Sequence, residues 1–135
     1  MTMSTDAALL DTTVLIALGR GERVDAVAEV IHPSLSVVTL AELKAGVAAA
    51  QGTSALLRRM RTLDAARDLT IYDIDERVAD AWVVLRSHLA LAGSRIGAND
   101  LWIAATAMAH GLPLLSHDTH FSALESAPGL TLLRA

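Results

Sequence analysis

The chain has 135 residues, a length typical of one domain with one hydrophobic core, so we expect a single domain over residues 1–135. Hydrophobic residues make up 53% of it and aromatic residues only 3%, which argues against a module that stacks single-stranded bases on aromatic rings. The absence of cysteine excludes disulfides and thiolate metal sites. The formal net charge of −4 gives no general attraction to phosphate, so nucleic-acid contact would require a local basic patch.

The N-terminal sequence MTMSTDAALL has no basic segment before a long apolar run, so it does not resemble a signal peptide. No stretch reaches the roughly 18 consecutive apolar residues expected of a membrane span. We therefore expect a cytoplasmic protein with no membrane partner.

Strands and helices alternate along the first half of the chain. Residues 7–10 form a short apolar run that predicts a buried strand ending at Asp11. Thr39 and Glu42 have the T-x-x-E spacing of a capping box, which predicts Thr39 as the N-cap of a helix. The other elements expected here are helices over residues 12–18, 22–31 (ended by Pro33) and 53–67, and a strand over residues 35–38.

The second half continues the alternation. Asp75 predicts the N-cap of a long amphipathic helix that stops before Gly93. The next helix is expected to begin at residue 98 or 99 and to run to residue 110, because Gly111 suits the position just after a helix end. The other elements expected here are strands over residues 69–74, 113–116 and 130–133, and a short helix over residues 121–125. Short apolar strands separated by helices are typical of a parallel sheet covered on both faces.

Three acids follow strand ends closely in this pattern. Asp11 closes the first strand, Glu42 lies one helical turn after the second, and Asp118 lies two residues after the fourth. Asp100 lies in the first turn of the helix that leads back into the fourth strand, so it points to the same edge. Open α/β sheets bind ligands beyond the carboxyl ends of their strands. We therefore expect four carboxylates to converge on one pocket.

Four carboxylates in one cleft repel one another and raise one another's pKa, so a positive charge must compensate them. Ligation by oxygen alone, without cysteine or clustered histidine, favours Mg²⁺ or Mn²⁺. Two such ions are the usual device for hydrolysing a phosphodiester.

Each acid also has a structural explanation of its own. Glu42 could be the capping-box glutamate, Asp100 an acid that complements the helix dipole, and Asp118 a turn residue. Asp11 is the hardest to explain in this way, because an ionised carboxylate at the end of a buried strand needs a partner. The convergence of all four favours a shared site.

Four stretches carry a family resemblance: LLDTTVLIAL, VVTLAELKAG, GANDLWIAATAMAHGLPLLSHDTHF and the closing LTLL. In this order they resemble the successive motifs of PIN-domain ribonucleases, most closely the VapC toxins of bacterial toxin–antitoxin pairs, over essentially the whole chain. The resemblance implies an α/β fold, a three-layer α/β/α sandwich with a central parallel sheet of four to five strands. It also implies an endoribonuclease that depends on Mg²⁺ or Mn²⁺.

The resemblance assigns roles to individual residues. It places the catalytic acids at Asp11, Glu42, Asp100 and Asp118. Among these, Asp11, Asp100 and Asp118 would hold the metal, and Glu42 would complete the site directly or through water. Ser116 stands where the family has a hydroxyl residue, more often threonine, that helps to hold the catalytic water. Thr12 matches the small hydroxyl residue after the first acid, and Asn99 would orient Asp100.

The resemblance also implies a mechanism and partners. Water would attack the phosphorus of RNA in line and the 3′ oxygen would leave, giving 5′-phosphate and 3′-hydroxyl ends. A homodimer is expected, together with a cognate antitoxin that lays a helix in an apolar groove and inserts a basic side chain into the acidic pocket.

Other polar and aromatic residues have weaker functional interpretations. His117 and His120 flank Asp118, but a zinc site would lack a third ligand, so we expect exposed loop histidines. The RRMR stretch, residues 58–61, is either a surface for RNA phosphates or the solvated face of a helix. Arg95 would reach the mouth of the pocket. Trp82 and Trp102 are expected to pack in the core or in a dimer interface.

Two alternative functions remain open at this stage. The DTTVL stretch also resembles the strand-end nucleophile of aspartate-based phosphatases, but Thr13 stands where these enzymes have a second acid. Their downstream lysine has no clear counterpart, because the only lysine, Lys44, lies in the helix of Glu42. The other alternative is an inactive domain that binds RNA or protein, against which the retention of four acids argues.

Overall fold

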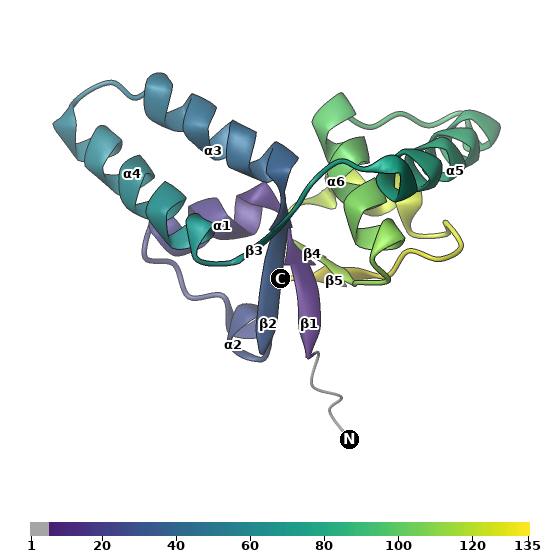
Figure 1. The fold of residues 1–135 in the computed structure, drawn as a ribbon, viewed down its shortest axis with the longest axis horizontal. Helices are drawn as coiled ribbons and strands as arrows, with labels where there is room; N and C mark the ends of the chain where they lie inside the picture. Colours follow the sequence, from purple (N-terminus) through teal and green to yellow (C-terminus); the bar gives the residue numbers. More distant parts are fainter. Residues whose placement is uncertain (1–5) are drawn as a thin grey trace.

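The computed structural model describes residues 6–135, so the N-terminal segment assessed above for a signal peptide lies largely outside the described range. Strands and helices alternate along the chain (Figure 1). In chain order they are β1 (Ala7–Leu10), α1 (Thr12–Gly19), α2 (Asp25–Ala28), β2 (His32–Ser36), α3 (Val37–Ala48), α4 (Thr53–Arg67), β3 (Thr70–Tyr72), α5 (Glu76–Ala92), α6 (Ala98–Ala109), β4 (Leu114–Ser116), the 3₁₀ helix η1 (Thr119–Leu124) and β5 (Leu132–Arg134).

The five strands form one sheet in the order β3-β2-β1-β4-β5, and every neighbouring pair is parallel. β1 lies at the centre, where Leu9 is in register with Ser34 of β2 and with Leu114 of β4. All strands therefore end at the same edge of the sheet. The predicted α/β fold with a central parallel sheet is confirmed.

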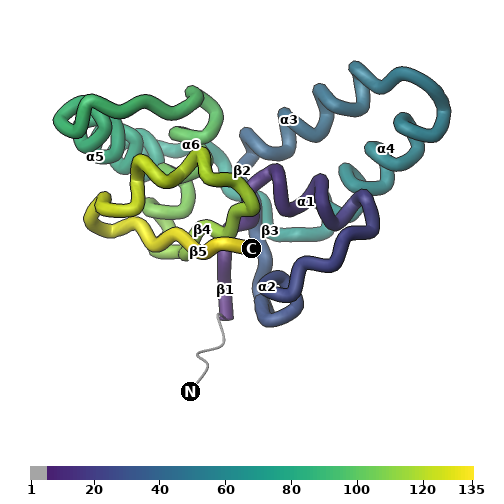
Figure 2. Tube along the Cα trace, turned by 180° about the vertical axis from the view of Figure 1, so that it is seen from behind, coloured from purple at the N-terminus to yellow at the C-terminus, as the bar shows by residue number. Residues whose placement is uncertain are grey.

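Helices cover both faces of this sheet. Helices α1, α3 and α4 lie on one side of it and α5 and α6 on the other, an arrangement that the two opposite views share (Figures 1 and 2). Adjacent residues of β1 point to opposite faces, so Leu9 packs with Leu85 and Ile103 while Leu10 packs with Val14 and Leu35. The central strand β1 is continuously apolar because both of its faces are covered.

The start of α3 differs from the prediction. The capping box at Thr39 is wrong, because Ser36 is the N-cap and its Oγ accepts a hydrogen bond from the backbone N–H of Val38 at 3.1 Å. Thr39 lies inside the helix and is fully buried. The preceding strand accordingly ends at Ser36 instead of residue 38. Val37 and Val38 favour a strand by local propensity, but the serine cap and the packing of Val38 on the core outweigh it.

The region before β2 also differs from the prediction. The helix expected over residues 22–31 is confined to Asp25–Ala28, and Pro33, expected to end it, lies within β2. Pairing of β2 with β3 begins only at Ser34, so the missing N–H of Pro33 removes no bond of that ladder.

The boundaries of the long helices are confirmed. Asp75 caps α5 by accepting a hydrogen bond from the N–H of Val78 at 3.1 Å. Gly93, with φ 66°, and Gly111, with φ 62°, follow α5 and α6 in the left-handed conformation that favours glycine. Within residues 6–135, no helix has the length and apolar character needed to cross a membrane.

Candidate active site

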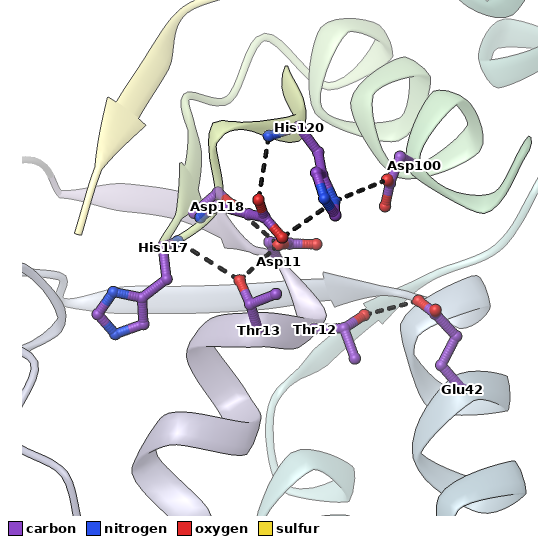
Figure 3. Close-up of polar contacts among 9 residues, drawn as sticks. Asp11, Thr12, Thr13, Glu42, Asp100, His117, Asp118 and His120 are labelled. Carbon is purple, nitrogen blue, oxygen red and sulfur yellow. Dashed lines mark hydrogen bonds and ion pairs between the residues drawn. The ribbon is translucent and has the colours of Figure 1, made fainter. Parts of the chain in front are cut away.

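Four acids reach the carboxyl edge of the sheet from four different elements (Figure 3). Asp11 lies between β1 and α1, and Asp118 is the N-cap of η1, just after β4. Asp100 lies in the first turn of α6, and Glu42 is in the middle of α3. The structure therefore brings together, at one edge, the carboxylates that the strand-end rule pointed to.

Asp11 is the buried centre of this group, with 2% of its surface exposed. Although it is the N-cap residue of α1, its side chain makes no capping hydrogen bond. Its Oδ2 instead accepts from Thr13 Oγ1 at 2.6 Å and from Ser116 Oγ at 2.9 Å. These two donors offset the cost of burying the carboxylate and hold it in place between the first turn of α1 and the end of β4.

Ser116 joins two of the acids. Its hydroxyl donates to Asp11 Oδ2 and accepts from the backbone N–H of Asp118 at 3.0 Å. Because Ser116 ends β4 and Asp11 follows β1, this one side chain couples the ends of two neighbouring strands. The role in holding water that the resemblance gives to Ser116 stays a prediction.

Glu42 is oriented by hydroxyl groups. Thr12 Oγ1 lies 2.8 Å from Glu42 Oε1 and 3.0 Å from Thr39 Oγ1, and both threonines are buried. A hydroxyl has a single proton, so Thr12 donates to the carboxylate and accepts from Thr39. Glu42 is therefore held by a bridge between α1 and α3, and it is not a capping residue.

His120 lies inside the site, which the sequence did not reveal. Its Nδ1 lies 2.9 Å from Asp118 Oδ2 and 3.7 Å from Asp100 Oδ2, so the ring stands between two acids (Figure 3). Its backbone N–H also donates to Asp118 Oδ1 at 3.1 Å. The available signal was the D-T-H spacing, since an Asx turn brings residue i+2 back to the carboxylate. Both histidines are exposed, as expected, but the ring of His117 points away from the acids.

Three remaining expectations concern residues near the site. Thr12 is part of it through Glu42. Asn99 is exposed and makes no hydrogen bond to Asp100 among the described residues. Arg95 is exposed and forms no ion pair within residues 6–135. The structure therefore gives Asn99 and Arg95 no contact with the acids.

The electrostatics of the site are those of uncompensated negative charge. The pKa of Asp100 is raised above its ordinary value, first by burial and then by the charge of Asp11. Glu42 and Asp118 raise it further, whereas His120 lowers it. A cation at this position would relieve the repulsion.

Comparison with known proteins decides the family. Residues 8–126 match the model of the PIN domain. The chain is also 39% identical to ribonuclease VapC5 of Mycobacterium tuberculosis over 134 residues, which cover 99% of each protein. This chain is a PIN-domain protein. Ribonuclease VapC4 of the same organism is 43% identical over 98 residues, which cover 73% of this chain and 75% of VapC4.

Solved structures agree with this assignment. The PIN domain superposes on the crystal structure of VapBC-5, a member of the VapBC family of toxin–antitoxin systems from M. tuberculosis, with a TM-score of 0.88 and 39% identity. That match covers 96% of this chain and 98% of the other. FitAcB from Neisseria gonorrhoeae matches with a TM-score of 0.76 and 31% identity over 93% of this chain and 96% of that one. The resemblance to VapC-type PIN domains is confirmed.

The donor chemistry of the PIN-domain site suits a hard divalent cation. Its acids offer only oxygen, and the pKa of Asp100 is raised by burial and then by neighbouring negative charge, which Mg²⁺ or Mn²⁺ would neutralise. Among residues 6–135, however, no three histidine or acidic side chains are already grouped as a metal site. The ring of His120 occupies space between Asp100 and Asp118 instead. The assignment of Asp11, Asp100 and Asp118 as metal ligands therefore stays a prediction.

Proposed function

We propose that this protein is a metal-dependent endoribonuclease that acts as the toxin of a toxin–antitoxin pair. The observation that supports this most directly is the convergence of Asp11, Asp100 and Asp118 at the carboxyl edge of a PIN-domain sheet. The curated relatives are named ribonucleases, VapC5 and VapC4. Four acids from distant positions, one of which has a raised pKa, suit phosphodiester hydrolysis better than a purely structural role.

Asp11, Asp100 and Asp118 would hold Mg²⁺ or Mn²⁺, with Glu42 completing the site. When bound, the metal would neutralise charge on the phosphate and would lower the pKa of water, so that water loses a proton more easily and attacks the phosphorus. The chain's own residues set the geometry. Thr13 and Ser116 fix the Asp11 carboxylate, and Ser116 ties Asp118 to it through the Asp118 N–H.

Hydrolysis by water needs no ribose 2′-hydroxyl and would leave 5′-phosphate and 3′-hydroxyl ends. The preference for RNA would then come from the shape and single-stranded character of the substrate. The phosphatase alternative has less support, because Asp11 is 2% exposed and its Oδ2 already accepts two hydrogen bonds.

The first prediction tests the acidic site. Asp11→Asn should lower the Mg²⁺- or Mn²⁺-dependent cleavage of RNA by at least about 100-fold, the scale expected when a group that organises transition-state charge is lost. The measurement is the rate of cleavage of labelled RNA with each metal and with a chelator. The control is Asp64→Asn, which removes an exposed carboxylate from α4. Equal cleavage by wild type and Asp11→Asn, with both variants folded, would show that the proposed site is wrong.

An antitoxin partner is part of this proposal, because solved relatives are VapBC toxin–antitoxin complexes. A hollow of 710 Å³ offers a groove for its helix between α1 and α4. The apolar side chains that line this groove include Leu15, Leu18, Val27, Ala65 and Leu69. Co-expression with the neighbouring reading frame, followed by purification through a tag on this chain, would show whether such a partner is bound.

A further inference from the structure

Two hollows lead away from the acidic site and share one wall. The first, of 230 Å³, is lined by Glu42 together with Arg58 and Arg59. The second, of 750 Å³, is lined by Thr13, the hydroxyl partner of Asp11, and by His117. Both are also lined by Ile16 and Arg20 of the α1 segment. Arg20 therefore stands beside two openings, each of which borders a residue of the site.

The position of Arg20 follows from α1. The helix begins after Asp11, and Arg20 is its C-cap residue, with its N–H bonded to the carbonyl oxygens of Ile16 and Ala17. Ile16 and Arg20 are four residues apart and so lie on one face of the helix. Nine residues of helical rise place the Arg20 backbone about 13 Å from that of Asp11. The long side chain of Arg20 can extend from there toward a phosphate that flanks the reacting one.

The charges around these hollows are not balanced. Arg20 and Arg58 have no carboxylate within ion-pair distance in the described part of the chain, although Glu22 and Glu42 line the same hollows. Arg59 donates from Nη1 to the carbonyl oxygen of Gly46 at 2.7 Å, which holds its guanidinium against α3 without neutralising it.

Some other arginines form ion pairs. Arg23 pairs with Asp25 at 2.7 Å, and Arg67 pairs with Asp64 at 3.8 Å. Unpaired arginines also occur elsewhere among the described residues, Arg95 for example, but Arg20 and Arg58 line hollows that border residues of the site, in a chain whose net charge is −4. A polyanion could place one phosphate at the acidic site, where a metal ion would bridge the two. Its adjacent phosphates would then lie over α1 and α4, beside Arg20 and Arg58.

We propose that Arg20 and Arg58 bind the phosphates of single-stranded RNA on one side of the scissile bond, an inference that rests on the proposed function. Arginine suits this role because its planar guanidinium can donate two parallel hydrogen bonds to a phosphate. Such contacts position the strand and carry no sequence information. Arg20 and Arg58 also stand at the rim of the groove assigned to the antitoxin, so RNA and antitoxin would compete for them.

The test measures binding apart from cleavage. A short, labelled single-stranded RNA of mixed sequence is titrated with Asp100→Asn protein, in which cleavage should be blocked, over a series of salt concentrations. Arg20→Gln and Arg58→Gln are added singly to this parent, and Arg67→Gln serves as a control on the same helix as Arg58. Each test variant should weaken binding by roughly tenfold, as expected for loss of a charged hydrogen bond. Each should also lower the slope of log K against log salt by about 0.7.

The outcomes separate the two proposals. If Arg20→Gln and Arg58→Gln bind RNA like Arg67→Gln, or if they weaken only the copurified antitoxin, the inference is overturned and the ribonuclease proposal stands. If the parent binds RNA through these arginines but wild type cleaves no RNA with either metal, the ribonuclease proposal fails, and the phosphate-binding role of Arg20 and Arg58 stands without a scissile bond beside it. In active protein, Arg20→Gln should raise KM with little change in kcat, and an unchanged KM would contradict the inference.

Discussion

At the scale of single residues, the acids of the site differ in how they are supported. Asp11 receives two hydroxyl donors and Glu42 receives one. Among residues 6–135, the side chain of Asp100 receives no hydrogen bond, and the Nδ1 of His120 lies 3.7 Å from its Oδ2, which is beyond hydrogen-bond range. Burial and its acidic neighbours therefore act on Asp100 with little compensation, and its pKa is raised.

This difference predicts that Asp100→Asn stabilises the metal-free protein. A raised pKa in the folded state means that ionising Asp100 costs folded stability, and the cost grows as pH rises from the ordinary value of 3.8 through the raised one. The variant should therefore melt at a higher temperature than wild type at neutral pH, and the difference should vanish below pH 3.8. Thermal unfolding in chelator over a pH series measures this. Asp73→Asn is the control, and a variant less stable than wild type at neutral pH would contradict the prediction.

At the scale of elements, the contact of α1 with α4 determines where the site's hydroxyls lie. Gly19, at the end of α1, packs so closely on α4 that a Cβ there would overlap the side chain of Thr62. Rotation of Thr62 would move Oγ1 away, but it would break the hydrogen bond from Oγ1 to the carbonyl oxygen of Arg58 and would leave the Thr62 Cβ in tight contact at 3.1 Å. The other end of the same helix carries Thr12 and Thr13, which orient Glu42 and Asp11.

We therefore predict that Gly19→Ala lowers the free energy of unfolding by about 1–3 kcal/mol through overpacking. The matched control is Gly46→Ala in α3, where the nearest atom to the new Cβ is Arg59 Cδ at 4.0 Å. That change should be neutral or stabilising, because alanine favours a helix over glycine by about 1 kcal/mol. Denaturant unfolding measures both variants. Thr62→Ala should recover part of the loss in a double-mutant cycle, and additive effects would argue against the close contact.

At the scale of the whole molecule, helices project on both sides of the sheet (Figures 1 and 2). Trp82 of α5 and Trp102 of α6 stack within the chain, with ring centroids 5.2 Å apart, and pack against the core as expected. The outer surface of α5 nevertheless keeps large apolar side chains in solvent. Val83 is 56% exposed, Val84 47% and Leu91 91%. Such a surface suits an interface with a second copy.

We predict a homodimer that buries this surface of α5. Light scattering after size exclusion should give twice the chain mass of 14.2 kDa for wild type. The double variant Val83→Glu with Val84→Glu should be monomeric, because it would place charges in a desolvated contact. Leu57→Glu, at an exposed apolar position on α4, is the control and should remain dimeric. A monomeric wild type, or a dimer that survives the double variant, would contradict the prediction.

The sequence by itself determined the parallel sheet and the edge at which its acids gather. Short, mainly apolar strands between helices permit few other arrangements, and three of the four acids follow strand ends closely in the sequence. The helix boundaries at Asp75, Gly93 and Gly111 could be predicted for the same reason, because a helix cap depends on only a few neighbouring residues.

The tertiary structure alone decided which groups touch. Ser116 meets Asp11 across 105 residues of chain and Thr12 meets Glu42 across 30. Ser36 in place of Thr39 starts α3 because packing of the following residues outweighs a local capping pattern. The place of the His120 ring between two acids also depends on how separate elements meet. Periodicity and spacing describe residues that are close along the chain. The contacts of the site depend instead on how separate helices and strands pack, and a local sequence pattern does not specify that packing.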